Sequence, residues 1–197
     1  FCMEYERKIR EMGGIGFFLG GIGPDGHIAF NVRGSSTYSA TRLTGTNYET
    51  QAAAASDLGG IEISRSRLVI TIGLATITFN PTATAIVIAA GDAKAEIVRQ
   101  AIEESSNPQF PATTLQDLDN ARFYLTKGAA GRLTERTFIQ FCNTPTLDDQ
   151  HVDDVVISLS LTRNKAIQEL TKDDFEHDRF AKELLRKTGK NFEECST

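Results

Sequence analysis

Two side chains that can move protons, Asp25 and His27, stand two residues apart in a glycine-rich loop. An aspartate at this spacing can fix the orientation and tautomer of the imidazole, which leaves the other ring nitrogen to transfer a proton. Glycines on both sides of the pair leave room for a small substrate, and their backbone N–H groups can bind an anion. The spacing therefore predicts proton-transfer chemistry at residues 20–27.

Two other interpretations fit the same residues. In a tight turn, Asp25 would bond its own backbone and His27 would be only a packed side chain. A metal site would need a third ligand, which the loop does not supply. The chain has three cysteines, which are far apart in sequence: Cys2, Cys142 and Cys195. Their odd number and wide spacing argue against a zinc site and against a set of disulfides, and they are typical of a protein in a reducing compartment. We therefore expect no metal.

The loop follows an apolar run, 15–19, that predicts a short buried strand. Ligands bind at the carboxyl ends of strands in open α/β sheets, which is where this loop would lie. A second apolar run, 83–90, predicts a parallel strand, and Gly91-Asp92 then opens a helix over 93–104. Further strands are expected over 68–72 and 121–125, a short strand near 41–43, a short helix over 113–118, and helices over 2–12 and 48–58.

This alternation of strands and helices predicts an α/β class with a Rossmann-like parallel sheet. Beyond residue 128 the sequence is charged and shows no further strand. We expect an α/β domain over 1–128 and a helical C-terminal extension over 129–197, with helices over 132–142, 149–165 and 173–188. His151 and His177 fall on charged helices of this extension and are expected to be solvated.

The composition narrows the range of partners. The 197 residues are 40% hydrophobic and carry a net charge of −5 without a basic run. Such a chain is a poor candidate for binding nucleic acid or an anionic membrane. The sequence contains neither an apolar run of about 18 residues nor a signal-peptide pattern at its start. These features predict a soluble cytoplasmic protein.

The loop carries a resemblance to a known family. Residues 19–31, Leu-Gly-Gly-Ile-Gly-Pro-Asp-Gly-His-Ile-Ala-Phe-Asn, closely resemble the signature of glucosamine-6-phosphate deaminases, also called isomerases. The resemblance spans about residues 2–126 and includes Gly34-Ser35-Ser36, Thr41-Arg42-Leu43 and Gly91-Asp92-Ala93-Lys94. The related 6-phosphogluconolactonases share Gly-x-Asp-Gly-His but continue with Thr-Ala-Ser-Leu-Phe. Ile28-Ala29-Phe30-Asn31 therefore favours the deaminases.

The resemblance implies a cofactor-free isomerisation that releases ammonia and gives fructose 6-phosphate. It implies that His27 accepts and returns the proton during opening of the sugar ring and that Asp25 supports this step. Lys94 would hold the sugar phosphate, although alone it also fits a solvated helix lysine. The other residues assigned to substrate or phosphate binding are Gly21, Gly23, Gly26 and Asn31. The resemblance also implies a homo-oligomer.

Three departures from the family pattern bear on activity. Val32-Arg33 stands where the family has Glu-Pro, and Val32 cannot stabilise an imidazolium. The alanine-rich helix at 52–55 lacks the family's phosphate-binding arginine. The family's N-terminal half, which carries a phosphate loop and the aspartate base of the isomerisation, has no counterpart here. We expect a partial α/β domain, with the N-terminal half absent, that does not turn over alone.

Regulation and alternative functions stay open at this point. Ser35 and Arg42 match an allosteric amino-sugar phosphate site of some family members, but the lysine that should follow is Thr44. Both residues also fit an ordinary loop surface. One alternative function is a sugar-phosphate-binding regulatory module without catalysis, which Val32 would permit. Another is an isomerase or lactonase acting on a different phosphosugar.

Overall fold

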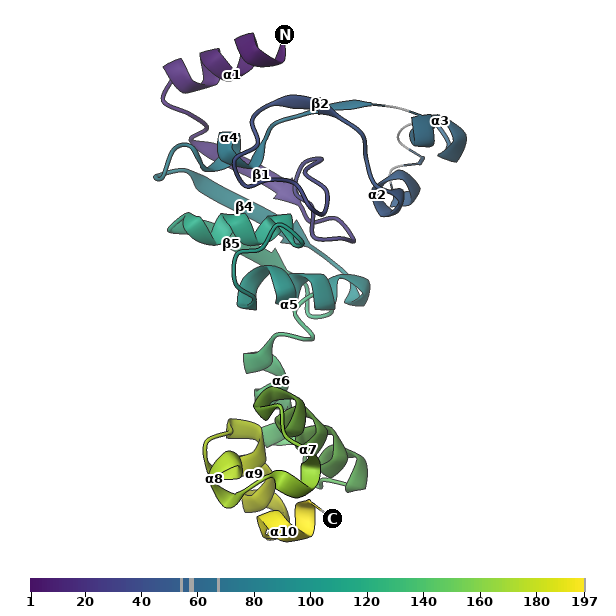
Figure 1. The fold of residues 1–197 in the computed structure, drawn as a ribbon, viewed down its shortest axis with the longest axis vertical. Helices are drawn as coiled ribbons and strands as arrows, with labels where there is room; N and C mark the ends of the chain where they lie inside the picture. Colours follow the sequence, from purple (N-terminus) through teal and green to yellow (C-terminus); the bar gives the residue numbers. More distant parts are fainter. Residues whose placement is uncertain (54, 57–58, 67, 197) are drawn as a thin grey trace. The chain divides into compact units, whose positions relative to one another are not determined.

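The computed structural model describes residues 1–53, 55–56, 59–66 and 68–196 and divides into two compact units, Phe1–Thr134 and Glu135–Thr197 (Figure 1). Each unit has its own hydrophobic core. The observed boundary falls after Thr134, whereas the sequence predicts one after residue 128. The difference arises because Ala129 is fully buried in the first core and Leu133 packs against it.

The centre of the first unit is a parallel sheet of three strands in the order β1-β4-β5. These strands are β1 (Phe17–Gly21), β4 (Thr84–Ala89) and β5 (Asn120–Leu125). β4 pairs in parallel with β1 on one side and with β5 on the other (Figure 1). The predicted α/β class and the three predicted strands of the parallel sheet are confirmed, with boundaries that shift by a few residues.

One face of this sheet packs on helices. Phe18 of β1 and Ala85 and Val87 of β4 point into the core. They are covered by helix α5 (Ala95–Glu103) and by a 3₁₀ helix, η2 (Pro111–Asp117), where the sequence predicts a short helix over 113–118. α5 buries apolar residues at helical spacing along one side: Ala95, Ile97, Val98 and Ala101. This amphipathic stripe explains why the segment forms a helix against the sheet.

The connection from β1 to β4 differs from the prediction. Strands β2 (Arg42–Thr44) and β3 (Val69–Thr71) occur near the expected positions, but they form a separate antiparallel pair. Helix α2 (Tyr48–Ala53) is shorter than the predicted 48–58, of which residues 54 and 57–58 lie outside the described residues. Two further helices, α3 (Ile61–Ser66) and α4 (Leu74–Thr78), occur where the sequence analysis predicts none. Tertiary burial stabilises α4, whose Leu74 and Ile77 are fully buried.

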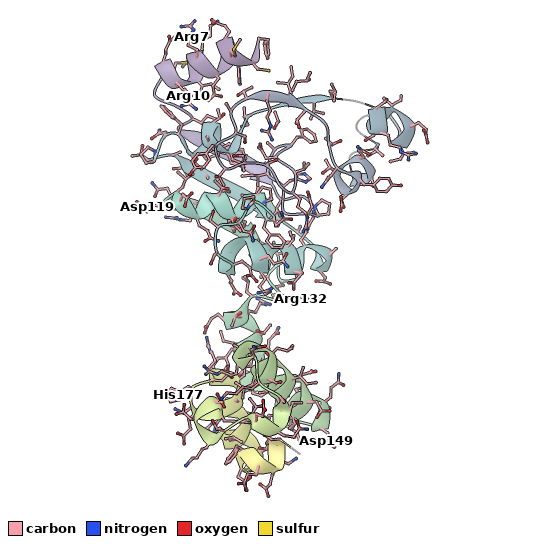
Figure 2. All side chains as sticks on the ribbon, in the orientation of Figure 1. Arg7, Arg10, Asp119, Arg132, Asp149 and His177 are labelled. Carbon is pink, nitrogen blue, oxygen red and sulfur yellow. The ribbon has the colours of Figure 1, made fainter. Side chains whose placement is uncertain are left out.

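A buried carboxylate anchors the N-terminal helix, α1 (Cys2–Glu11). Glu6 accepts hydrogen bonds from the Thr41 backbone and hydroxyl at 3.1 and 2.9 Å and from the Thr76 hydroxyl at 2.8 Å. Arg10, labelled in Figure 2, donates to Glu6 at 2.8 Å. Burial alone would raise the pKa of Glu6, but these hydrogen bonds lower it. α1 is therefore tied to the segment that carries β2.

The second unit is entirely helical within the described residues (Figure 1). Its core centres on the fully buried Phe175. The helix predicted over 173–188 is two helices, because the Asp178 side chain accepts hydrogen bonds from the backbone of Phe180 and Ala181 at 2.9 Å and begins a new helix. The helices are α6 (Thr134–Asn143), α7 (Asp149–Arg163), α8 (Lys172–Glu176), α9 (Arg179–Thr188) and α10 (Phe192–Cys195), with a 3₁₀ turn, η3 (Ile167–Glu169).

Candidate active site

The glycine-rich loop lies at the carboxyl ends of two neighbouring parallel strands. It begins directly after β1, and Gly21 at the end of β1 pairs with Ile88 near the end of β4. β4 is followed by the 3₁₀ helix η1 (Asp92–Lys94). Lys94 Nζ donates a hydrogen bond to the Ile22 carbonyl at 2.9 Å. The parallel pairing therefore brings together a loop and a lysine that are distant in sequence, at the edge where open α/β sheets bind ligands.

Asp25 and His27 are hydrogen-bonded. Their Oδ1 and Nδ1 atoms lie 2.5 Å apart. The Asp25 side chain is 1% exposed and that of His27 is 13% exposed, so the carboxylate is covered and the imidazole reaches the surface. An ionised carboxylate can only accept, so Nδ1 donates and Nε2 is left to exchange a proton. This geometry is that of an oriented general acid–base, rather than of a turn in which Asp25 bonds only its own backbone.

The carboxylate of Asp25 has further donors. Its Oδ2 accepts from the Arg33 backbone N–H at 3.1 Å and from Asn47 Nδ2 at 2.6 Å. Burial alone would raise the pKa of Asp25, but the hydrogen bonds from His27, Arg33 and Asn47 and the charge of His27 hold the pKa of that carboxyl well below its usual range. Asp25 is therefore ionised at neutral pH, as a partner of an imidazolium must be.

Sequence reasoning missed two members of this network, Asn47 and Thr50. The Thr50 hydroxyl lies 3.2 Å from His27 Nδ1 and 2.5 Å from Asn47 Oδ1, and the Thr50 side chain is almost fully buried. Asn47 Oδ1 also accepts from the Thr50 backbone at 3.1 Å. An asparagine three residues before a threonine at the start of a predicted helix is a capping pattern, which could have indicated the local structure but not its contact with the loop.

The glycines and Asn31 shape the loop. A Cβ atom on Gly23 would lie 1.9 Å from the His27 ring, so only glycine allows the imidazole to occupy this position. Gly26 has a φ of +80°, which glycine adopts without strain. The Asn31 side chain is fully buried, and its Nδ2 donates to the carbonyls of Ile28 and Ile72 at 3.1 and 2.8 Å. Asn31 thus anchors the loop to the chain beyond β3.

A cavity of about 370 Å³ borders His27. Its walls come from strand β1 and from the loop that follows it. The lining residues are Phe18, Leu19, Gly20, Gly21, Ile22, Gly23, His27 and Ala29. Lys94 is not one of them, but the Ile22 carbonyl that it contacts belongs to a lining residue. His27 thus borders a space large enough for a small ligand, and Asp25 lies behind it.

Ser35 and Arg42 are also brought together. Arg42 Nη2 donates to Ser35 Oγ at 3.1 Å, and Arg42 Nη1 donates to Asn31 Oδ1 at 2.7 Å. Burial lowers the pKa of Arg42. Because Asn31 also holds the loop, this arginine is connected to the segment that positions His27.

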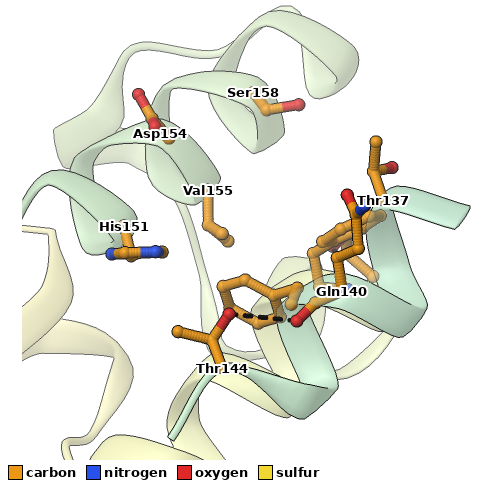
Figure 3. Close-up of a pocket in the computed structure, with 10 residues that line it drawn as sticks. Thr137, Gln140, Thr144, His151, Asp154, Val155 and Ser158 are labelled. Carbon is orange, nitrogen blue, oxygen red and sulfur yellow. Dashed lines mark hydrogen bonds between the residues drawn. The ribbon is translucent and has the colours of Figure 1, made fainter. Parts of the chain in front are cut away.

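A second cavity, of about 410 Å³, lies within the helical unit (Figure 3). Figure 3 shows His151, Asp154 and Ser158 on α7, Thr137 and Gln140 on α6, and Thr144 directly after the end of α6. His151 is 38% exposed and its Nδ1 lies 2.5 Å from Asp148 Oδ1, so it reaches solvent as predicted while also bonding to the start of its own helix. His177 is 67% exposed, as predicted. Asp148 is itself 70% exposed, so this pair lacks the covered carboxylate found at Asp25.

Within the described ranges, no group of three or more His, Cys, Asp or Glu side chains is placed to hold a metal ion. None of the helices in the described part of the chain combines the length and hydropathy needed to cross a bilayer.

Replacing Thr50 by valine is expected to slow proton transfer at His27 by roughly fivefold and to leave ligand binding unchanged. The reason is the loss of one hydrogen bond, about 1 kcal/mol, from a buried network that orients the ring. The matched control is Thr114→Val, because Thr114 is equally buried and its hydroxyl has no partner among the described residues. Equal rates for the two variants would exclude a positioning role for Thr50.

The lowered pKa of Asp25 predicts that the stability of the fold depends on pH. The pKa of Asp25 is lower in the folded than in the unfolded chain. As the pH falls below about 4, the Asp25 carboxylate is therefore protonated in the unfolded chain first, and the contribution of Asp25 to the free energy of unfolding declines. The difference in unfolding free energy between the wild type and Asp25→Asn should therefore be larger at pH 7 than at pH 3. Urea titrations of both proteins measure it, and contributions of other carboxylates cancel in the difference. A pH-independent difference would contradict the assignment.

Comparisons with known proteins identify relatives of the chain. No family model matches. A glucosamine-6-phosphate deaminase of Caenorhabditis elegans is 38% identical over 140 residues, which cover 71% of this chain and 52% of that protein. Glucosamine-6-phosphate deaminase 2 of Xenopus laevis is 34% identical over 163 residues, 83% of this chain and 58% of that protein. The chain spans about half the length of the curated relatives it matches.

A solved structure shows the same fold. It is described as a monomeric glucosamine-6-phosphate deaminase of the NagB superfamily. The superposition has a TM-score of 0.60 at 30% sequence identity and covers 66% of this chain and 53% of the other. The parallel sheet and the helices on it thus agree with an experimentally determined relative.

Proposed function

Because the chain belongs to the family of glucosamine-6-phosphate deaminases, we propose that it forms the ring-opening part of an enzyme that converts glucosamine 6-phosphate to fructose 6-phosphate and ammonia. The observation that carries this proposal is the hydrogen bond between the buried Asp25 and the partly exposed His27 beside the 370 Å³ cavity. A pyranose opens when one proton leaves the C1 hydroxyl and another reaches the ring oxygen. One oriented imidazole can perform both transfers in turn.

In this mechanism Nε2 of His27 takes the proton from the C1 hydroxyl and returns it to the ring oxygen, so that the C1–O5 bond breaks and an open-chain aldehyde forms. Asp25 stabilises the imidazolium that exists between the two transfers, because it stays ionised. Gly23 allows the ring to lie close to the backbone. Asn47 and Thr50 hold the pair in place, which we propose compensates for the missing glutamate at Val32.

We assign the phosphate group to Lys94, beside the loop that Gly21, Gly23 and Gly26 shape; the backbone N–H groups of Gly23 and Gly26 donate to the carbonyls of His27 and Gly23 and so hold the loop itself. Burial lowers the pKa of Lys94 and the charge of Asp25 opposes this change. The hydrogen bond to the Ile22 carbonyl holds the ammonium beside the cavity wall. A cation at the carboxyl end of parallel strands suits a phosphate. Asn31 contributes by fixing the loop.

The deamination itself needs more than these residues. The resemblance places the base that moves a proton between C1 and C2 in the portion of the relatives that has no counterpart here, so we expect the 197 residues alone to open the ring without releasing ammonia. Homo-oligomerisation and a cytoplasmic location remain proposals, and the solved relative is described as monomeric. Ser35 and Arg42 remain a candidate regulatory phosphate site, supported by their hydrogen bond.

Ring opening can be tested on the chain as it is, because it interconverts the α and β anomers of the sugar. Magnetisation-exchange NMR of glucosamine 6-phosphate measures this rate with and without the protein. We expect acceleration for glucosamine 6-phosphate, and a weaker effect for glucose 6-phosphate. Binding without any acceleration would favour the regulatory-module alternative. Acceleration confined to another phosphosugar, or hydrolysis of 6-phosphogluconolactone, would favour the second alternative.

A further inference from the structure

The helical unit contains a cavity that the proposed function does not use. This second cavity has a volume of about 410 Å³ and is lined by residues of α6, of α7 and of the start of α9 (Figure 3). Its apolar lining consists of Phe141, Val155 and Phe180. The rings of Phe141 and Phe180 contact each other at a tilt, with centroids 5.7 Å apart. A space of this size, bordered by aromatic and aliphatic side chains, can accept a small organic molecule.

The polar lining of the second cavity is acidic. Asp154 on α7 forms no hydrogen bond or ion pair with any residue that the structure describes. Asp178 accepts two hydrogen bonds from the backbone at the start of α9, and both end on Oδ1. The described lining residues include neither a lysine nor an arginine, and the neighbouring Arg179 pairs with Glu135 at 2.7 Å. Negative charge without an internal counterion therefore lies beside an apolar lining.

The uncharged polar residues of the lining can accept further hydrogen bonds from a ligand. The Ser158 hydroxyl and the Gln140 side-chain amide have no partner among the described residues. His151 uses Nδ1 for its contact with Asp148 Oδ1, which leaves Nε2 for another group. An ammonium group carries three N–H donors and no acceptor. The lining therefore supplies the acceptors that such a group needs.

Contacts from outside the cavity hold its walls in place. Lys187 Nζ donates to the backbone carbonyls of Phe141 at 3.2 Å and of Thr144 at 2.5 Å, which fixes the end of α6. The capping bonds of Asp178 fix the start of α9 and with it Phe180. A site whose walls are already ordered loses less conformational entropy when a ligand binds.

We propose that the second cavity binds a small organic cation, namely a primary amine with an aromatic or aliphatic body. Its ammonium group pairs with Asp154, and its body packs against Phe141 and Phe180, where cation–π attraction adds to the apolar contact. A sugar phosphate is an anion and would be repelled by the same carboxylates, so this site and the one beside His27 select opposite charges. The proposal uses residues of the second unit alone and does not depend on the ring-opening chemistry.

The test titrates the 197-residue chain with 2-phenylethylamine and follows the backbone amides by ¹H–¹⁵N NMR. We expect resonances of residues 137–144 and 151–158 to shift, with a dissociation constant of about 1 mM for a ligand of this size. 2-Phenylethanol has the same body without the charge and should bind at least about fivefold more weakly. 3-Phenylpropionate has the same body with a negative charge and should leave these resonances unchanged.

The matched variants are Asp154→Asn and Asp153→Asn. Both residues are exposed neighbours on α7 and both changes remove one negative charge, but only Asp154 lines the cavity. Asp154→Asn should weaken binding of 2-phenylethylamine by about fivefold, whereas Asp153→Asn should keep the wild-type affinity. The comparison separates a specific ion pair from general attraction of a cation to an acidic protein.

Four results would overturn the proposal. The first is the absence of shifts in residues 137–144 and 151–158 at about ten times the expected dissociation constant. The second is equal binding of 2-phenylethylamine and 2-phenylethanol, and the third is an equal loss of affinity in the two variants. The fourth is a set of shifts confined to the residues around His27, which would assign the amine to the other cavity.

Discussion

Replacing His27 by glutamine is expected to reduce the rate of anomer exchange in glucosamine 6-phosphate by about 100-fold or more. Glutamine keeps a polar side chain of similar length, but it cannot accept and return a proton. The other lining residues of the cavity and Lys94 are unchanged, so the dissociation constant should change by less than about threefold. Exchange NMR and isothermal titration measure the two quantities on the same sample.

The matched control is His151→Gln, because His151 also pairs with an aspartate at 2.5 Å but lies in the helical unit. This variant should retain the wild-type rate. If His27→Gln keeps the wild-type rate while His151→Gln loses it, the catalytic pair has been assigned to the wrong cavity. If His27→Gln loses binding and rate together, His27 acts as a ligand-binding group and not as the proton-transfer group.

Replacing Phe175 by alanine is expected to destabilise the helical unit by about 3–5 kcal/mol, which is comparable to the whole stability of a small domain. Phe175 is fully buried, stacks at a tilt against Phe192 with ring centroids 6.3 Å apart, and lies in a core formed only by residues of that unit. Its removal leaves a large cavity. We expect the helices of residues 135–196 to unfold in a separate transition, at a lower denaturant concentration than in the wild type.

The first unit should be affected little, because its core contains no residue of the second. Hydrogen exchange resolved by peptide distinguishes the two units, and amides of β4 should keep wild-type protection in Phe175→Ala. The control is Leu161→Ala, which truncates an exposed leucine of α7 and should cost less than about 0.5 kcal/mol. A single unfolding transition, in which the amides of β4 lose protection together with those of the helices, would contradict the independence of the two cores.

The strands that carry the site could be predicted because their signal is local. The apolar runs at 15–19 and 83–90 correspond to β1 and β4, and a Gly-Asp turn marks the start of the helical segment that follows β4. Parallel pairing of those strands then places Lys94 next to the loop at Ile22. The chemistry at Asp25 and His27 followed from residue type and spacing, and the hydrogen bond between them supports it.

The short elements of the fold and the further members of the site depend on tertiary contacts, which local sequence patterns do not encode. Helix α4 has only five residues and forms because Leu74 and Ile77 are buried, which periodicity over so short a segment does not reveal. β2 and β3 are three residues each and form a separate ribbon. Asn47 and Thr50 reach the catalytic pair from a segment more than twenty positions along the chain. A capping pattern specifies the start of a helix but not the loop that it contacts.

The most direct test of the central claim is ¹⁵N NMR of the histidine rings, because the chain has only three histidines. We predict that His27, assigned with His27→Gln, carries its proton on Nδ1, and that its Nε2 resonance shifts when glucosamine 6-phosphate is added. His151 and His177 should not respond. A ligand that shifts His151 and leaves His27 unchanged, or a His27 protonated on Nε2 alone, would contradict the account.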